Sequence, residues 1–285
     1  MSITYILKES ISSFRKDGCL NLSAAIAFYA ILSLIPFLYL LVSLVGFFVG
    51  SEGEILPKVS SYISQLIPFI SKPVLNEVGR INLGSGFFAW FAVFFMLWSS
   101  TLIFNSIEFS LKKVFKVEHL RPFWISKVMS LLFVPVAGLV FIILQIFNLA
   151  IGAFVRLSNY FGITLIPLFL DSIVLKYIFP FSLTFLLLSA LYAIVPPGRI
   201  FLRQAIIGGF ICAIMLEVAK NVFGWMIMHN PNFGLVYGSL NTIILMVLWI
   251  FYASAIFLFC AEIISAYQKQ QAKCLKLKVP KVKSY

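Results

Sequence analysis

The chain has 285 residues, of which 61% are hydrophobic and only 11% charged, and its formal net charge is +12. A mean hydropathy of +1.03 is too high for a protein whose whole surface faces water, which excludes the soluble globular classes. The basic residues lie between apolar runs and at the chain ends, so nucleic acid is not needed to explain the positive charge.

Residues 1–23 are predicted to form a cytoplasmic amphipathic segment. An apolar stripe at helical spacing runs beside basic residues, which is typical of a helix that lies on the membrane surface. The stripe is Ile3, Leu7, Ile11 and Phe14, beside Lys8, Arg15 and Lys16. No cleavable signal peptide is expected, because the first apolar run begins near Ala24 and is much longer than a signal h-region.

Six apolar stretches reach the length of about 20 residues that a helix needs to cross a hydrocarbon core of about 30 Å. They cover residues 24–49, 86–107, 128–155, 173–195, 205–228 and 240–267. We therefore predict an all-α, polytopic bundle of about six transmembrane helices, formed by a single membrane domain over residues 24–267.

Lys and Arg residues set the predicted orientation, because they accumulate in cytoplasmic connections. The two tails and the second and fourth connections hold sixteen of them, whereas the opposite connections hold five. Both termini are therefore predicted to be cytoplasmic. Residues 268–285 form a basic tail, and its last dozen residues are expected to be disordered and close to anionic lipid headgroups.

Two further features concern the outer connection and the first span. Ile55 to Leu66 is predicted to be an external amphipathic helix, which either roofs a cavity or packs on the bundle for stability. Pro36 removes a backbone hydrogen bond inside the first span, so a kink is expected there and Pro36 is a hinge candidate.

Ionisable side chains within apolar spans are costly and usually face a bundle interior or a wet cavity. Glu217 and Lys220 lie three residues apart on one helical face, where their charges can neutralise each other, and Gly209, Ala213 and Gly224 continue that face. The stripe is expected to point inward. It either lets a neighbouring helix approach and ties the bundle together, or forms the wall of a polar cavity.

Other spans carry polar residues that are candidates for the same groove. They are Asn105 and Glu108 in the second span, Gln145 and Asn148 in the third, and Asn241 in the sixth. Glu262 lies close to the cytoplasmic end of the sixth span, and we expect it to pair with a basic loop residue in a structural role.

The sequence favours no cofactor, metal or catalytic site. The four cysteines form no Cys-x-x-Cys pair, and no Gly-x-x-x-x-Gly-Lys-Ser/Thr phosphate loop occurs. A nuclease is not expected either, because the topology places His119 and His229 on opposite sides of the membrane.

Several motifs in order resemble the YihY/BrkB family over nearly the whole chain, roughly residues 10–267. They are the segment from Ala24 to Pro36, Glu217-x-x-Lys220, Tyr237-Gly238-Ser239-Leu240, Leu248-Trp249-Ile250 and Ala261-Glu262. Two positions depart from the family pattern, since Cys260 stands where Gly is usual and Asn241 where a small residue is commoner. The resemblance implies a bacterial inner-membrane protein; some members are linked to serum resistance, some are proposed as envelope-lipid transporters, and some have carried a ribonuclease BN label.

Two hypotheses follow for function. In the first, the chain moves a lipid or another amphiphile, and Glu217, Lys220 and the other polar candidates wet a groove for its headgroup while acyl chains stay in lipid. In the second, the chain is a non-transporting scaffold for envelope assembly, and its basic tail recruits a cytoplasmic partner. Membrane lipids are the expected partners in the first hypothesis.

Overall fold

The computed structural model describes residues 3–49, 86–117, 124–133, 179–196, 200–229 and 241–278, together with Pro122, Val136 and Leu139. Its elements are α1 (Ile3–Lys16), α2 (Cys19–Val49), α5 (Gly86–Phe115), α8 (Phe179–Ile194), α9 (Leu202–His229) and α11 (Asn241–Lys278). A shorter apolar helix covers Trp124–Phe133. The described residues thus confirm the all-α fold class.

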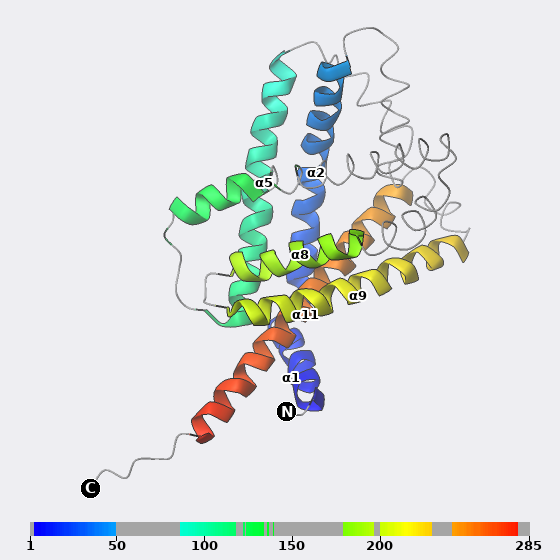
Figure 1. The fold of residues 1–285 in the computed structure, drawn as a ribbon. Helices are drawn as coiled ribbons and strands as arrows, with labels where there is room; N and C mark the ends of the chain where they lie inside the picture. The colour runs from blue at the N-terminus through cyan, green and yellow to red at the C-terminus, as the bar shows by residue number, and fades with distance from the viewer. Residues whose placement is uncertain are drawn as a thin grey trace, which may run out of the picture.

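Helix α11 is central to the arrangement. It packs against α1, α2, α5 and α9, while α2 pairs with α5 and α8 pairs with α9. Figure 1 shows α2 and α5 running alongside each other and the α8–α9 pair crossing them. The buried core lies where these helices meet, and its largest fully buried apolar side chains are Tyr192, Phe104, Leu111 and Leu258.

Three of the described helices are long and apolar enough to span a membrane, within Val93–Phe115, Leu202–Ile227 and Ile243–Gln271. The number of candidate spans rises to four if α1 and the first part of α2 form one bent span. The predicted third and fourth spans fall partly outside the described residues, as does the predicted external helix between Ile55 and Leu66. The total of about six spans therefore stays a prediction.

The chain bends by 66° between α1 and α2, at Asp17 and Gly18. Gly18 has a φ of +64°, in the left-handed region that glycine enters without steric cost, and it ends α1 just after two basic residues, Arg15 and Lys16. The Gly18 amide donates to the Arg15 carbonyl over 3.2 Å, and the Asn21 amide donates to the Gly18 carbonyl over 3.0 Å. Gly18 thus closes one helix and opens the next.

We expect Gly18→Ala to destabilise the protein by about 1 kcal/mol, because alanine is strained at a positive φ. Steric crowding adds little, since the nearest atom to an added Cβ would be Lys113 Nζ at 3.9 Å. Thermal unfolding in detergent measures the change. Gly224→Ala is the control, because a Cβ there meets open space. An equal loss of stability in both variants would contradict the assignment of strain to Gly18.

Pro36 does not interrupt α2, which continues as one helix from Cys19 to Val49 with Pro36 inside it. Ser33, one turn earlier, donates its hydroxyl to the Ala30 carbonyl over 2.8 Å. The sharp bend in this part of the chain is the one at Gly18, and the hinge at Pro36 stays a prediction.

The C-terminal segment differs from its prediction. Helix α11 continues to Lys278, so residues 274–278, the first five of the dozen expected to be disordered, are helical. Gln268 and Gln271 both hydrogen-bond to Gln204 of α9, over 2.7 Å and 3.1 Å, which fixes α11 beyond Tyr267. The C-terminal end of α11 then projects away from the other helices (Figure 1).

Candidate functional site

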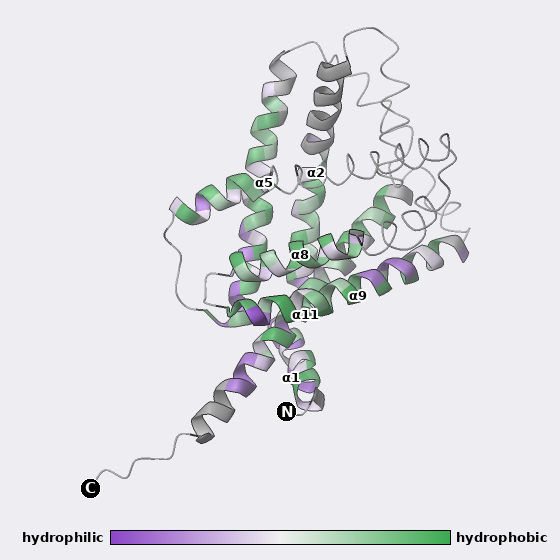
Figure 2. Ribbon diagram, viewed as in Figure 1, coloured by the Kyte–Doolittle hydropathy of each residue, from purple (hydrophilic) through white to green (hydrophobic). Residues whose placement is uncertain are grey.

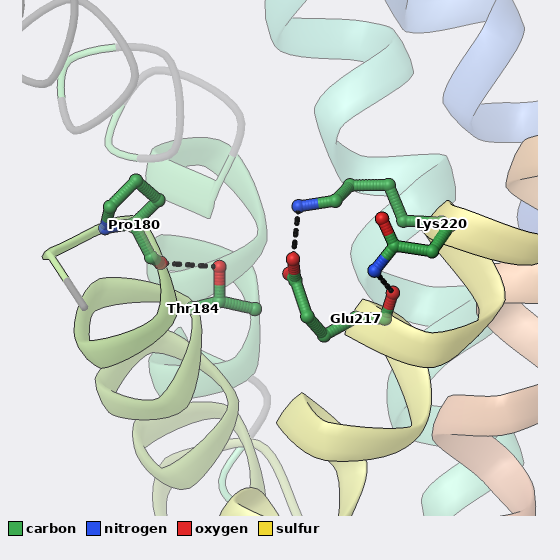
Figure 3. A network of polar contacts seen from close by, with 5 residues as sticks. Pro180, Thr184, Glu217 and Lys220 are labelled. Atoms are coloured by element: carbon green, nitrogen blue, oxygen red, sulfur yellow. Dashed lines mark hydrogen bonds and ion pairs between the residues drawn. The ribbon is translucent and has the colours of Figure 1, made fainter. Parts of the chain in front are cut away.

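The Glu217 and Lys220 side chains form an ion pair on α9, with Lys220 Nζ 2.5 Å from Glu217 Oε1. The side chains are not enclosed: 37% of Glu217 and 56% of Lys220 is exposed. In Figure 3 both reach from α9 towards α8, where Thr184 lies opposite Glu217. The Thr184 hydroxyl donates to the Pro180 carbonyl over 2.9 Å at an exposed position.

The stripe of small and polar residues from Gly209 to Gly224 is buried in its first half and exposed in its second half. The expectation that all of it points inward is therefore not met. Gly209 and Ala213, in its first half, are buried against the bundle. From Glu217 onward it is open, and a Cβ on Gly224 would meet nothing within 4 Å. Figure 2 shows hydrophilic residues along this second half of α9. The first half of the stripe therefore packs tightly against another helix, and the second half is an accessible polar face.

Apolar side chains share the exposed surface of this half of the helix. Val218, Val222 and Trp225 are each more than half exposed and flank the ion pair along α9. The surface thus combines opposite charges, a hydroxyl and apolar groups. Such a surface matches the two parts of an amphiphile, a polar headgroup and a hydrocarbon chain.

Asn105 and Glu108, the candidates on α5, are placed differently. Asn105 is exposed. Glu108 is half-buried, and its Oε2 accepts a hydrogen bond of 2.7 Å from the hydroxyl of Ser126, on the helix Trp124–Phe133. Glu108 therefore holds that short helix against α5, which is a structural role.

The remaining candidates are not brought to the Glu217 face by the described structure. Gln145 and Asn148 lie outside the described residues. Asn241 is the first residue of α11. Their place in a groove stays a prediction.

Glu262 is buried, and within the described residues it accepts a hydrogen bond from a thiol. It is 1% exposed, and its Oε1 lies 3.7 Å from the Cys19 Sγ, which donates to it. The Asp17 carboxyl group, at the bend between α1 and α2, lies close to Glu262 as well. Asp17 Oδ2 is buried and accepts no hydrogen bond from a protein donor. The expected basic loop partner is not among the contacts described and stays a prediction.

This carboxyl pair joins the bend after α1 to α11, and it was missed because its members are far apart in sequence. The sequence did contain a local signal for the Asp17 side of this pair. Lys16-Asp17-Gly18 has the basic last turn and glycine that are typical of a helix C-terminus, which predicts the bend but not its partner on α11.

No group of three His, Cys, Asp or Glu residues that could hold a metal ion occurs within the described ranges. His229, at the end of α9, lies with its Nδ1 3.0 Å from the Trp225 carbonyl oxygen and its ring stacked on the Trp225 indole. His119 is outside the described residues.

The family model described as virulence factor BrkB matches residues 10–282. The chain belongs to the BrkB family. This confirms the family suggested by the motifs, and with the apolar helices it identifies an integral membrane protein.

Among the curated proteins, this BrkB chain is similar to membrane proteins designated UPF0761. It is 22% identical to one from Legionella pneumophila over 90% of the chain and 60% of the relative, and 22% identical to one from Alcanivorax borkumensis over 90% and 58%. The chain thus spans about three fifths of the length of these relatives.

A BrkB-family relative of more equal length comes from Bacillus subtilis strain 168. It is 26% identical over 94% of this chain and 96% of the relative, and it is named as a ribonuclease-like protein, YfkH. No solved structure matches the chain.

Proposed function

We propose that this BrkB-family chain moves a lipid or another amphiphile across the bacterial inner membrane, and that the Glu217–Lys220 face of α9 contacts its headgroup. The observation that carries the proposal is an accessible ion pair near the middle of a helix apolar enough to span a membrane. A charged side chain at the centre of a bilayer costs about 2.5–3.5 kcal/mol on insertion scales, so such a pair needs water or a polar ligand beside it.

The surroundings of the pair support an amphiphile over a wholly polar solute. Lys220 supplies a compact positive charge for a phosphate or carboxylate, and Glu217 balances that charge when no headgroup is bound. The exposed Val218, Val222 and Trp225 offer apolar contact to an acyl chain within the same turns. A path for a lipid requires exposed contacts for both the headgroup and the acyl chain, and α9 offers both.

The test is the flipping of fluorescent lipids with different headgroups in proteoliposomes. We expect the wild type to flip at least one main envelope lipid and Glu217→Ala/Lys220→Ala to lose that activity, because the headgroup then meets no ion pair on this face of α9. Val218→Ala/Val222→Ala is the matched control, since it changes the same two turns and keeps the ion pair; it should retain headgroup selectivity. Equal flipping by the charge-deleted variant and the wild type, at matched insertion, would refute the proposal.

The scaffold hypothesis rests on a different observation, the projection of α11 beyond the bundle (Figure 1). Truncation after Gln271 separates the two functions, because it removes the basic end of the chain and keeps the Gln204–Gln271 hydrogen bond. A transporter should keep flipping lipid after this truncation. Loss of envelope function in cells with flipping absent from the wild type would favour the scaffold.

A further inference from the structure

The exposed face of α1 carries apolar and basic side chains together. Leu7, Ile11 and Arg15 are spaced four residues apart, so they lie in one row along the helix, with Lys8 beside it. Leu7 is 42% exposed and Ile11 49%, and Lys8 and Arg15 are exposed as well. Apolar groups flanked by long basic side chains are typical of a helix that lies in a membrane interface, where its charges reach the headgroups.

The opposite face of α1 is packed against the other helices. Ser10 and Ser13 are buried, and the Phe14 ring meets Phe259 of α11 edge-on, with the ring centroids 5.8 Å apart. Phe14 thus leaves the apolar stripe predicted from the sequence and anchors α1 to α11. Helix α1 cannot rotate to bury its exposed row without breaking these contacts.

The charges of α1 are divided between the same two faces. Its one acidic residue, Glu9, faces α11, where its Oε1 is 3.5 Å from Lys269 Nζ. The exposed face has only cations, which are Lys8, Arg15 and Lys16. Neither ion pair between described residues includes any of these three. A face with cations alone is electrostatically complementary to an anionic surface.

The C-terminal end of α5 adds two exposed lysines to this surface, Lys113 and Lys116. Lys113 reaches the bend after α1, since its Nζ is 3.9 Å from the position that a Cβ would take on Gly18. Figure 1 shows α1 and this end of α5 at the same end of the molecule. We call the five exposed basic residues the cationic face: Lys8, Arg15, Lys16, Lys113 and Lys116.

Lys116 has a backbone conformation that lysine rarely adopts. Its φ is +53°, in the left-handed region where glycine usually ends a helix. The Lys116 amide donates to the Lys113 carbonyl over 3.3 Å, and the Val117 amide donates to the Lys112 carbonyl over 3.2 Å, so Lys116 closes α5 as a glycine would. The chain thus has a positive charge at a position where glycine would be less strained.

We propose that the cationic face, together with Leu7 and Ile11, binds the anionic phospholipid surface of the cytoplasmic leaflet. The bend at Gly18 sets the orientation, because a helix at 66° to a span that crosses close to the bilayer normal runs nearer to the bilayer plane. The cytoplasmic leaflet is the anionic one, and the distribution of Lys and Arg predicts both termini on that side. The exposed apolar row favours a lipid surface over a free phosphate, because a wholly polar partner would leave it in water.

Lipid-dependent quenching in nanodiscs tests the proposal with the full-length protein. A fluorophore is attached to Ile11→Cys in a Cys274→Ala background, in which the other three cysteines are buried. The quencher is phosphatidylglycerol or phosphatidylcholine that carries a nitroxide close to its headgroup. We expect phosphatidylglycerol to associate about fivefold or more tightly than phosphatidylcholine, since each basic residue near an anionic surface contributes a factor of about five.

The charges of α1 are removed in Lys8→Gln/Arg15→Gln/Lys16→Gln. The ratio of the two association constants should then fall close to one, while both lipids still quench the label. Exposed positions tolerate such changes with little effect on folding. Arg203→Gln is the matched control, because Arg203 is an exposed basic residue on another helix, α9, and its loss should leave the ratio unchanged.

Lys116→Gly separates the charge from the fold of α5. Glycine suits the φ of this position, so the variant should unfold at a temperature at least as high as that of the parent protein. The preference for phosphatidylglycerol should nonetheless fall about twofold or more, because a cation is lost. An unchanged preference would refute the inclusion of α5 in the lipid-binding surface.

Three results would overturn the proposal as a whole. Equal association of the two lipids with the parent protein would show that the face does not select anionic lipid. Absence of quenching by either lipid would place α1 outside the membrane interface and leave the face to an acidic protein partner. Rapid disulfide dimerisation of unlabelled Ile11→Cys in proteoliposomes would assign the face to a second copy of the chain. Because the association constants are measured at equilibrium, none of these outcomes depends on whether α9 moves lipid.

Discussion

Gly209→Ala is expected to destabilise the protein by about 3 kcal/mol. A Cβ on Gly209 would lie 2.8 Å from the backbone nitrogen of Ser189 and 2.9 Å from its Cα, besides colliding with its hydroxyl. Backbone atoms cannot rotate away, so α8 and α9 would have to separate. Thermal unfolding in detergent and the yield of monodisperse protein measure the change.

Gly208 provides a matched control for this prediction, one residue earlier on the same helix. A Cβ there would collide with the end of the Ile264 side chain and otherwise approach only Tyr192, at 3.8 Å. Because a side chain can change rotamer where a backbone cannot, Gly208→Ala should cost about 1 kcal/mol. If Gly208→Ala proved the more damaging substitution, the close approach of α8 and α9 at Gly209 would be refuted.

This contact also shows what sequence reasoning achieved for α9. The small residues Gly209 and Ala213 were correctly placed on one face, since helical periodicity alone determines which residues share a face. Periodicity does not determine which helix packs against that face, or how far along α9 the packing extends. The stripe is therefore packed against α8 at Gly209 and open at Gly224, a difference that only the partner helix decides.

Helix ends were predicted too short for a related reason. The second span was predicted to end at Ile107, but α5 continues to Phe115 and buries Leu111 and Val114 completely. Hydropathy identifies residues that suit lipid, and the charged Lys112 and Lys113 lower it. The helix continues because protein, not lipid, covers its apolar side; Ser265 of α11 even donates to the Val114 carbonyl over 3.0 Å.

In the candidate site too, the sequence predicted the local contacts and missed the long-range ones. Glu217 and Lys220 are three residues apart, so their ion pair followed from the helical repeat. Cys19 and Glu262 are 243 residues apart, and their contact depends on the packing of α11 against α2, which the sequence does not predict. A buried polar residue without a local partner, such as Glu262, is thus the kind of feature for which sequence predicts importance but not its contact.

Glu262→Leu should destabilise the protein by about 2 kcal/mol, whereas Glu262→Gln should be tolerated. Leucine removes the acceptor of the buried Cys19 thiol, and an unsatisfied buried polar atom costs about 1–3 kcal/mol. Glutamine has nearly the same shape as glutamate, and its amide oxygen still accepts from the Cys19 thiol. Thermal unfolding of the variants in one detergent measures the difference.

A double substitution and a surface pair make this prediction specific to the buried contact. Cys19→Ala/Glu262→Leu should recover part of the loss, because removing both the donor and the acceptor leaves neither atom of this hydrogen bond unsatisfied. Glu9→Leu breaks the half-exposed Glu9–Lys269 pair, whose atoms are 3.5 Å apart, and should cost less than about 1 kcal/mol. Equal losses in Glu262→Gln and Glu262→Leu would show that Glu262 contributes a negative charge there, and not an acceptor for the Cys19 thiol between α11 and α2.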